Sequence, residues 1–543
     1  MQTETYDYVV VGGGSAGCVL ANRLSKDPAN RVLLLEAGGK DDWIWIHIPV
    51  GYLYCIGNPR TDWMYRTTKD PGLNGRDIHY ARGLGLGGCS LINAMVYMRG
   101  QARDYDEWAA LSDDSSWNWN NVLPLFKQHE DFYKGASEHH GAGGELRVEE
   151  QRLSWDILDR FAEAANQAGI PKTDDFNRGN NEGTGKFQVT QKTGVRWHAG
   201  KAFLRDIEQT RRNLHIVRHS HATRLLFEGK RCTGVEVLTK EGRDTKQWQA
   251  LARAETILAA GSIGTPQLLQ LSGVGPAPML QQHQIPVVHA LDGVGANLQD
   301  HLQLRMAFKV KGIKTLNTMA NSLIGKAMMG LEYAFRRTGP LTMAPSQLGI
   351  FTRSSKEHAT PNLEYHVQPL SLDKFGDPLH PFPAFTASVA NLRPTSRGHV
   401  RIQSARHEDK PEIHCAYLST PEDRKVAADA LKLSRRIAAM PALTPYSPEE
   451  FLPGPQFQSE EELAVAAGNI GTTIFHPVGT CKMGRADDDS AVVDPRLRVR
   501  GIDGMRVVDA SIMPTITSGN TAAPTMMIAE KAAGMILADH NRV

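Results

Sequence analysis

The first 25 residues constrain the fold more than any other part of the chain, because a strand, a glycine turn and a helix follow one another there. In 7-DYVVVGGGSAGCVLANRLS-25, the β-branched run at 8–11 predicts a buried parallel strand. Gly12, Gly14 and Gly17 then match G-x-G-x-x-G, and apolar residues recur at helical spacing after them. These glycines permit a tight turn, the approach of a pyrophosphate to the backbone, and close packing of the helix on the strand.

A second predicted strand supports a dinucleotide site. The segment 31-RVLLLEAG-38 contains Glu36, which follows Gly17 by 19 residues. A carboxylate at this spacing can accept hydrogen bonds from a ribose diol, while the helix N-terminus faces the phosphates. The two strands, the helix and the acid predict a dinucleotide-binding unit, but this motif does not separate NAD from FAD.

Further elements of the same kind follow. The segment 81–100 contains a glycine cluster with apolar flanks, which indicates a loop buried against a flat partner. Residues 221–239 alternate about a Glu-Gly-Lys turn and predict a β-hairpin. Residues 254–275 predict a buried strand, a small-residue turn and a helix.

The C-terminal region returns to the nucleotide-binding part. Residues 504–514 predict a strand whose carboxyl end carries Asp509, and ligands of doubly wound sheets bind at such ends. A helix is predicted over 518–537, with Asn520 as its N-cap.

The middle of the chain differs in pattern. Segments 362–370, 385–394 and 398–404 predict antiparallel strands, and 421–440 predicts a helix. We therefore expect an α/β protein with a Rossmann-type nucleotide-binding domain and a second, substrate-facing domain made of an antiparallel sheet plus helices. The expected division is 1–155 plus 190–310 plus 455–543 for the first domain, and 156–189 plus 311–454 for the second.

Composition excludes several other classes of protein. Lys and Arg number 61 and Asp and Glu 59, and no long basic run appears, so we expect no nucleic-acid partner. The six cysteines are scattered without zinc-type spacing, so we expect no metal site and a reducing compartment. The N-terminus lacks a basic secretory region, and no run of ~18 apolar residues predicts a membrane span. A cytoplasmic location follows.

One segment bears on membrane contact. Residues 321–337, NSLIGKAMMGLEYAFRR, predict an amphipathic helix with a basic end. Such helices most often pack over a domain face, which is the favoured interpretation. Peripheral contact with a membrane surface is the alternative.

The stretch 474-IFHPVGTCKMG-484 contains a histidine whose role its neighbours do not decide. His476 is a candidate metal ligand with Cys481, the partner of a cysteine nucleophile, an acid or base, or a packed loop residue.

Taken together, these motifs resemble the glucose–methanol–choline (GMC) family of FAD oxidoreductases, and within it bacterial alcohol and choline dehydrogenases. The resemblance runs from about Tyr6 to Leu537. Its motifs are 11-VGGGSAGCVLANRL-24, 87-GGCSLINAMV-96, 261-GSIGTPQLLQLSGVG-275, 293-GVGANLQDH-301, 475-FHPVGTCKMG-484, 506-RVVDASIMP-514 and 519-GNTAAPT-525.

The resemblance implies that the first domain binds FAD. The residues expected to hold the ADP half are Gly12, Gly14, Ser15, Ala16, Glu36 and Ala222. Those expected along the ribityl chain and flavin are Gly88, Ser90, Asn93, Ala94 and Val96. Those expected to contact the pyrophosphate-to-flavin portion are Asp509, Ala510 and Thr521.

Four positions depart from the family pattern. Ile92 stands where one subgroup attaches FAD covalently through a histidine, so noncovalent FAD is expected. Leu84 replaces a common basic residue, Cys89 a common small residue, and Ala522 a frequent Asn, so the finer flavin contacts differ here.

The resemblance also gives His476 a role. In this family the histidine and a second His or Asn face the flavin, and these positions are His476 and Asn520. A neutral imidazole with an ordinary pKa of ~6.5 is suited to accept a hydroxyl proton. Zinc would require more ligands than Cys481 adds, and the neighbours of Cys481 suggest a packed turn rather than a nucleophile.

The expected activity is FAD-dependent oxidation of a primary alcohol to an aldehyde. His476 accepts the proton, a hydride passes to flavin N5, and the electrons leave to a quinone or cytochrome rather than to O2. The alternatives are an oxidase that uses O2 and makes hydrogen peroxide, and a cyanohydrin lyase of the same fold with non-redox FAD. The Met- and Leu-rich segment 322–350 is expected to cover the site, which favours a nonpolar alcohol.

Overall fold

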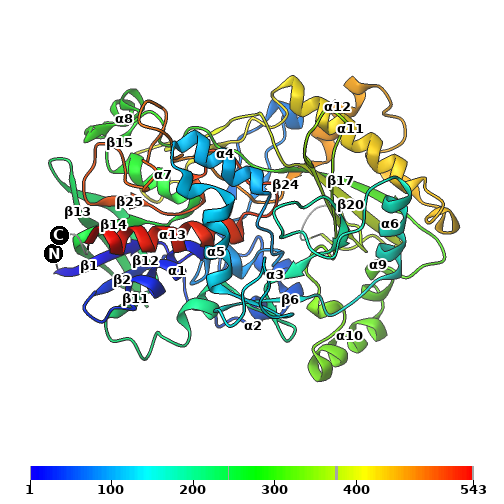
Figure 1. Ribbon diagram of the computed structural model, residues 1–543, viewed down its shortest axis with the longest axis horizontal. Coiled ribbons are helices and arrows are strands. Elements are labelled where there is room, and N and C mark those ends of the chain that lie inside the picture. The colour runs from blue at the N-terminus through cyan, green and yellow to red at the C-terminus, as the bar shows by residue number, and fades with distance from the viewer. Residues whose placement is uncertain (1, 243, 374–376, 541–543) are drawn as a thin grey trace.

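The computed structural model describes residues 2–242, 244–373 and 377–540. Two large sheets lie side by side along the long axis, each with its own helices, and both chain ends lie beside the first sheet (Figure 1). The predicted fold class, an α/β nucleotide-binding part joined to an antiparallel sheet with helices, is confirmed.

The first sheet, called the nucleotide sheet here, has seven strands. Its core is parallel, because β1 pairs in parallel with β2 and β14, β2 with β11, and β14 with β25. The predicted hairpin extends it as the antiparallel pair β12 and β13. The strands are β1 (Gln2–Val11), β2 (Val32–Leu35), β11 (Leu214–Val217), β12 (Ser220–Glu228), β13 (Arg231–Glu241), β14 (Asp244–Leu258) and β25 (Met505–Val507).

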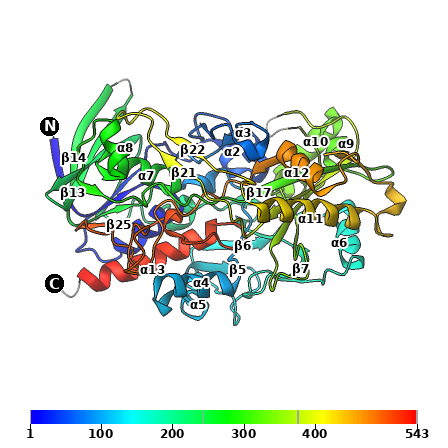
Figure 2. The same ribbon diagram turned by 90° about the horizontal axis from the view of Figure 1, so that it is seen from above.

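Helices cover the nucleotide sheet. Helix α1 (Ser15–Leu24) packs against the long C-terminal helix α13 (Ala522–His540), which also contacts α5 (Trp119–His129). In the second view, α13, α4 (Ala102–Ser112) and α5 lie together on one side of the molecule (Figure 2). The buried valines at the end of β1 and the buried leucines of β2 form the core beneath them, which explains why these two stretches lack polar alternation.

The second sheet is antiparallel throughout and also has seven strands. Its members are β7 (Gly183–Lys186), β17 (Leu302–Lys309), β18 (Leu348–Thr352), β19 (Leu363–Gln368), β20 (Ala384–Asn391), β23 (Glu449–Leu452) and β24 (Gly471–Thr473). Helix α11 (Pro421–Ala438) packs against β20 and also against α6 (Asp156–Gln167) and α12 (Glu460–Ile470). Thr420 caps α11 by accepting from the Asp423 amide, as its position before a proline suggests.

The sheets place some segments differently from the expected domain division. Strands β17 and β24 pair with each other in the second sheet, and α12 packs on α11, although all three lie in segments expected in the nucleotide-binding domain. A short strand does not show from its own residues which sheet it joins. The predicted strand at 398–404 forms as β21 (His399–Arg401), but it pairs with β22 (Glu412–His414) in a separate sheet beside α7 (Gly261–Leu271).

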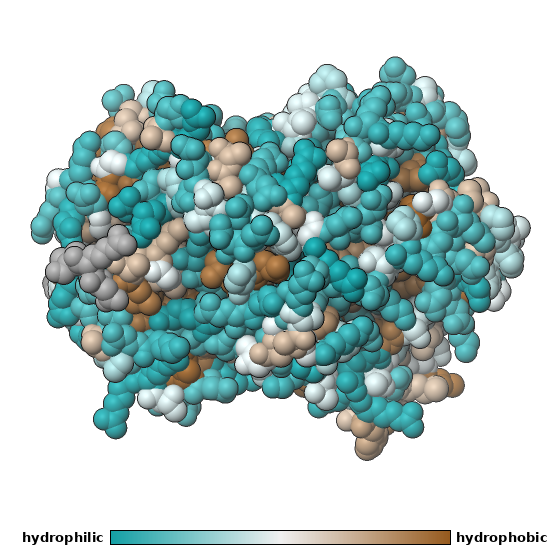
Figure 3. Space-filling view, in the orientation of Figure 1, coloured by the Kyte–Doolittle hydropathy of each residue, from teal (hydrophilic) through white to brown (hydrophobic). Residues whose placement is uncertain are grey.

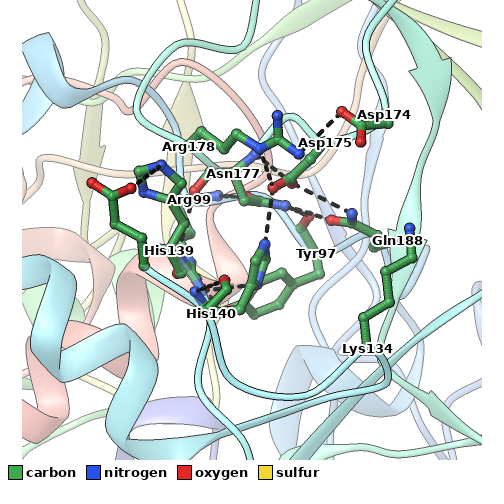
Figure 4. Close-up of polar contacts among 12 residues, drawn as sticks. Tyr97, Arg99, Lys134, His139, His140, Asp174, Asp175, Asn177, Arg178 and Gln188 are labelled. Atoms are coloured by element: carbon green, nitrogen blue, oxygen red, sulfur yellow. Dashed lines mark hydrogen bonds and ion pairs between the residues drawn. The ribbon is translucent and has the colours of Figure 1, made fainter.

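A network of buried charges ties three loops together. The Glu130 carboxylate accepts from Arg99 Nη2 at 2.9 Å and contacts His140 Nδ1 at 3.0 Å. His140 Nε2 lies 2.9 Å from Asp175 Oδ2, and Figure 4 shows His140 and Asp175 side by side. Burial alone would lower the pKa of His140, but the two carboxylates raise it above its usual range. The pKa values of both carboxyl groups are lowered, because these cations outweigh their burial.

Candidate active site

All sixteen predicted site residues line one cavity of about 1180 Å³. The cavity begins at the glycine turn after β1, follows the carboxyl edge of the nucleotide sheet, and reaches residues of the second sheet. The predicted residues that it brings together are Gly12, Gly14, Ser15, Ala16, Glu36, Gly88, Ser90, Asn93, Ala94, Val96, Ala222, His476, Asp509, Ala510, Asn520 and Thr521.

The glycine turn leaves the backbone open to a ligand. Gly12 has φ +107°, and a Cβ there would lie 2.5 Å from Ala259 O, so no other residue fits without strain. A Cβ on Gly14 would meet only one atom, at 4.0 Å, and a Cβ on Gly261 would meet nothing within 4 Å. Gly14 and Gly261 precede or begin the helices α1 and α7, so two helix N-termini border open space suited to phosphate groups.

Glu36 is held by the backbone of three loops. Its carboxylate accepts from the amides of Gly13 at 2.9 Å, Gly38 at 2.7 Å and Gly85 at 3.1 Å. Burial raises the pKa of Glu36, while these amides act in the opposite direction. The predicted ribose acceptor therefore also fixes the shape of the adenosine end of the cavity.

The second glycine loop packs directly on the first. Gly87 N donates to Gly13 O at 2.7 Å, and a Cβ on Gly88 would come within 2.7 Å of Gly14 Cα. The second loop is thus packed against the first glycine turn. Asn93 follows the loop and uses its side-chain oxygen to accept from the Met95 amide at 3.0 Å.

Asp509 organises the start of α7. Its carboxylate accepts from Gly261 N at 2.8 Å, Thr265 Oγ1 at 2.6 Å and Ser511 N at 2.8 Å. Burial raises its pKa despite these bonds. Asp509 thus lies at the carboxyl end of β25, as predicted, but both of its oxygens already have protein donors.

His476 lies between a second histidine and Asn520. Its Nδ1 is 3.0 Å from Nδ1 of His301, and its Nε2 is 3.2 Å from Nδ2 of Asn520. His301 Nε2 lies 3.2 Å from the carbonyl oxygen of Leu392. His301 comes from the loop before β17, His476 from the loop after β24, and Asn520 from the turn before α13. These three residues lie where the two sheets meet, and we call this region the seam.

These contacts fix the tautomers. A carbonyl only accepts, so His301 Nε2 carries a proton toward Leu392 O, and neutral His301 then accepts at Nδ1. His476 Nδ1 must be the donor in the bond between the two rings. His476 Nε2 therefore holds a lone pair, toward which Asn520 donates.

Electrostatics keep this pair neutral. Burial lowers the pKa of His476 well below 6.5, and the neighbouring groups His301, His366 and Arg82 shift it in the same direction. Burial also lowers the pKa of His301. At neutral pH, His476 is a free base rather than a cation.

Sequence reasoning gave no role to two titratable residues that contact His476, namely Asp300 and His301. Asp300 Oδ1 accepts from the His476 backbone amide at 2.8 Å, and its other oxygen accepts from Thr473 Oγ1 at 2.6 Å and from Tyr417. Asp300 and His301 end the quoted motif 293-GVGANLQDH-301, so the signal was present without an assigned role.

The predicted N-cap at Asn520 is wrong. Helix α13 begins at Ala522, and the carbonyl of Thr521 accepts from the Thr525 amide, so Thr521 is the capping position. The Asn520 amide nitrogen instead meets His476, and its Oδ1 has no hydrogen-bond partner in the described part of the chain. A buried amide oxygen beside a cavity is an acceptor available to a bound molecule.

The rival roles for His476 find no support in its surroundings. Cys481 is wholly buried, and burial raises the pKa of its thiol well above the usual range, which opposes a thiolate. The group Asp41, His47 and His198 has ligand atoms within 4.8 Å of one another. However, Arg205 bonds Asp41 and Lys201 bonds His47, so two cations already occupy these atoms.

A glycine turn before a helix, in one cavity with a neutral histidine, is the arrangement expected of a dinucleotide-dependent oxidoreductase. The chain belongs to the GMC oxidoreductase family: the family's N-terminal model matches residues 6–303 and its C-terminal model matches residues 394–529. The resemblance predicted from the motifs is thereby confirmed.

Individual relatives agree. The chain is 42% identical to an alcohol dehydrogenase [acceptor] of Pseudomonas putida, over 98% of this chain and 96% of that protein. It is 41% identical to an oxygen-dependent choline dehydrogenase of Proteus mirabilis, over 98% and 95%. A solved structure of formate oxidase from Aspergillus oryzae RIB40, studied for modification of its FAD, has 25% identity and a TM-score of 0.92, covering 99% of each chain.

The chain is thus an enzyme of an FAD-dependent oxidoreductase family, consistent with the predicted alcohol dehydrogenase, and its relatives include alcohol and choline dehydrogenases. The open faces of Gly14 and Gly261 and the unpartnered Asn520 oxygen fit such a cofactor, because they offer a phosphate cradle at one end and a polar contact at the other. No helix in the described residues is both long and apolar enough to cross a membrane.

Proposed function

We propose that this protein oxidises a primary alcohol to the aldehyde, with His476 as the proton acceptor. The observation that carries the proposal is the unprotonated Nε2 of His476, which lines the cavity beside the Asn520 amide. The substrate hydroxyl replaces that amide as the donor to Nε2, and the Asn520 side chain then holds the substrate oxygen. FAD bound in the cavity supplies the hydride acceptor at N5.

The proton balance is local. The hydroxyl proton would move from oxygen to His476 Nε2, and a hydride would leave the carbon that bears this oxygen, so the alcohol loses two electrons and two hydrogens and becomes the aldehyde. His476 Nδ1 keeps its own proton, directed to His301. The low pKa of His476 means that the imidazolium formed is unstable in its buried site, which favours release of the proton after each turnover.

The N-terminus of α13 supports this arrangement. Asn520, Thr521 and Ala522 all line the cavity, and the helix begins at Ala522. Its positive end would favour negative charge on a flavin bound there, a stabilisation of about 0.3–1 kcal/mol at exposed sites and more where water is excluded. Ile92, also in the cavity wall, cannot form a covalent bond to the cofactor, which supports noncovalent FAD.

The cavity wall changes the expected substrate. Within the Met- and Leu-rich segment 322–350, the cavity-lining residues are Pro345 and Ser346, so the basis for a nonpolar alcohol is lost. The second sheet instead contributes Gln303, His366 and Gln368 to the wall. We propose an alcohol with a second hydrogen-bonding group, since buried polar groups left without partners would oppose a plain alkyl chain.

The electron acceptor is proposed from the names of relatives. The Pseudomonas putida relative is named for an unspecified acceptor, which favours a quinone or cytochrome over O2. The Proteus mirabilis relative is named oxygen-dependent, and the Aspergillus oryzae structure is an oxidase, so an O2-using oxidase is the second candidate.

The decisive experiment mixes the yellow holoenzyme anaerobically with matched alcohols, for example 1-hexanol and 1,6-hexanediol, and follows the flavin absorption. Bleaching that is faster with the diol supports both the oxidation and the polar wall. Equal or faster bleaching with hexanol contradicts the substrate proposal alone. No bleaching with any alcohol would favour the cyanohydrin lyase alternative. Readmitting air then separates the acceptors, because rapid return of colour indicates an oxidase.

A further inference from the structure

Helix α10 (Leu323–Arg336) exposes an unusual amount of apolar surface. Among the described residues, ten large apolar side chains are exposed, and half of them belong to this one helix. Their exposed fractions run from 58% to 85%. They are Leu323, Ile324, Met328, Leu331 and Phe335.

The exposed side chains form a single stripe. At 100° per residue, the five positions fall within an arc of about 140° on one side of the helix. Met329 and Tyr333 lie on the opposite side and are buried, and Tyr333 donates to Gly194 O at 3.2 Å. The helix is thus packed on the protein by its narrow face, and its wide apolar face points outward.

The outward orientation of the apolar face of α10 is visible in two views of the molecule. Helix α10 projects at the lower right of the molecule, at the end remote from both chain termini (Figure 1). Tan and brown surface appears at the same projecting corner in the space-filling view (Figure 3). The favoured prediction from the sequence, a helix packed over a domain face, holds only for the narrow face with Met329 and Tyr333, because the pattern does not show which face the protein covers.

Positive charge borders the stripe. Lys326, Arg336 and Arg337 are exposed. The first two lie on the part of the helix circumference that the stripe leaves free, and Arg337 directly follows the last turn. The one acidic residue of the helix, Glu332, accepts from Thr338 Oγ1 at 3.0 Å and is only partly exposed. The projecting corner therefore combines an apolar strip with cations.

We propose that α10 docks this protein on an anionic phospholipid surface. Apolar side chains on one face and Lys or Arg on the other are the arrangement of a helix that lies in the membrane interface. The cations match the lipid phosphates in charge. A single projecting helix also suits a fluid surface, which can close around a convex strip, better than a rigid partner that would need a matching groove. The 14 residues of the helix are too few to span a bilayer, so the contact is peripheral.

Docking would fix the orientation of the cavity. Past α10 the chain forms a short 3-10 helix (Pro340–Thr342) and then Pro345 and Ser346, which line the cavity. The docked corner is therefore joined by fewer than ten residues to the wall of the site. The nucleotide sheet lies at the far end of the molecule and would face away from the lipid (Figure 1).

The test is co-sedimentation of the holoenzyme with two kinds of vesicle, pure phosphatidylcholine and phosphatidylcholine containing 30% phosphatidylglycerol, at low and high salt. We expect binding to the anionic vesicles, weakened at least tenfold in Leu331→Glu/Phe335→Glu, and weakened several-fold in Lys326→Glu/Arg336→Glu or by salt. Val465→Glu, which changes an exposed apolar residue on another helix, should bind like the wild type.

Flavin content and turnover of a water-soluble alcohol should be unchanged in all variants, which shows that they are folded. Absence of wild-type binding, or equal binding of wild type and Leu331→Glu/Phe335→Glu, would overturn the proposal. So would analytical ultracentrifugation that finds a wild-type dimer dissociated by Leu331→Glu/Phe335→Glu, because a second copy would then cover the stripe.

Discussion

The nucleotide sheet and the second sheet reach the same cavity with different chemistry. The nucleotide sheet contributes backbone: open glycines, two helix N-termini, and a glutamate clasped by three amides. The second sheet contributes side chains, among them Gln303, His366 and Gln368. The first kind of surface suits one fixed cofactor, whereas the second can change with the substrate. His301 and His476, the pair to which we assign the proton transfer, lie at the seam between the two.

The largest effect on turnover should come from a substitution at the seam between the two sheets. His476→Ala removes the proton acceptor, and we expect turnover to fall about 10²–10⁴-fold. Flavin content should remain that of the wild type, because the nucleotide sheet is untouched. Stopped-flow bleaching under anaerobic conditions measures the loss.

His283→Ala, a change on the surface after α8 (Ala277–Gln282), is the matched control and should behave like the wild type. Wild-type bleaching rates in His476→Ala would remove this histidine from the role of base.

Glu36→Gln tests the surface that the nucleotide sheet contributes to the cavity. It keeps the shape of the side chain but removes the charge that three amides and the expected ribose contact share. A charge-assisted hydrogen bond contributes about 1.5–3 kcal/mol, so FAD retention should weaken by one to two orders of magnitude. Turnover per bound flavin should change little. Full flavin occupancy after extensive dialysis would argue against the assignment.

The difference between the two surfaces also explains what the sequence could predict. Backbone recognition demands residues without side chains at fixed spacing, so Gly12, Gly14 and Glu36 were found from a short stretch. Side-chain recognition in the second sheet has no such spacing, because His366 lies in a strand that shows only alternation. The bond between His301 and His476 spans 175 residues and depends on the pairing of β17 with β24, which no local pattern reveals.

Helix α10 shows the same limit in another form. Its periodicity predicted the helix and its apolar stripe, but the side that the protein covers depends on Met329 and Tyr333 packing against distant loops. A short amphipathic segment carries no information about which face is buried.

The charge network around His140 should affect stability alone. We expect His140→Gln to lower the free energy of unfolding by about 1.5–3 kcal/mol, the usual contribution of a charged hydrogen bond. The pKa of His140 is raised in the folded protein. Its contribution to the free energy of unfolding is therefore full below pH ~6.5 and is lost as pH rises through the folded value. The pKa values of Glu130 and Asp175 are lowered in the folded protein. Their contribution to the free energy of unfolding is therefore full above pH ~4 and is lost as pH falls through the folded values.

Denaturant titrations of wild type and variant should therefore differ most between pH ~4 and ~6.5 and converge at higher pH. A difference that grows steadily toward alkaline pH would contradict a protonated His140.

The smallest effect expected is at His301, which acts on the chemistry through His476. His301→Leu removes the acceptor for Nδ1–H of His476 and so releases its tautomer, and we expect turnover to fall about tenfold, or ~1.4 kcal/mol. It also removes one of the neighbouring groups that lower the pKa of His476, so the acid limb of the kcat/KM profile should move to higher pH. His301→Asn places an amide oxygen near the position of Nδ1 and should restore most of the turnover. If both variants lose activity equally and keep the wild-type acid limb, then His301 only fills space, and the seam needs one histidine rather than a pair.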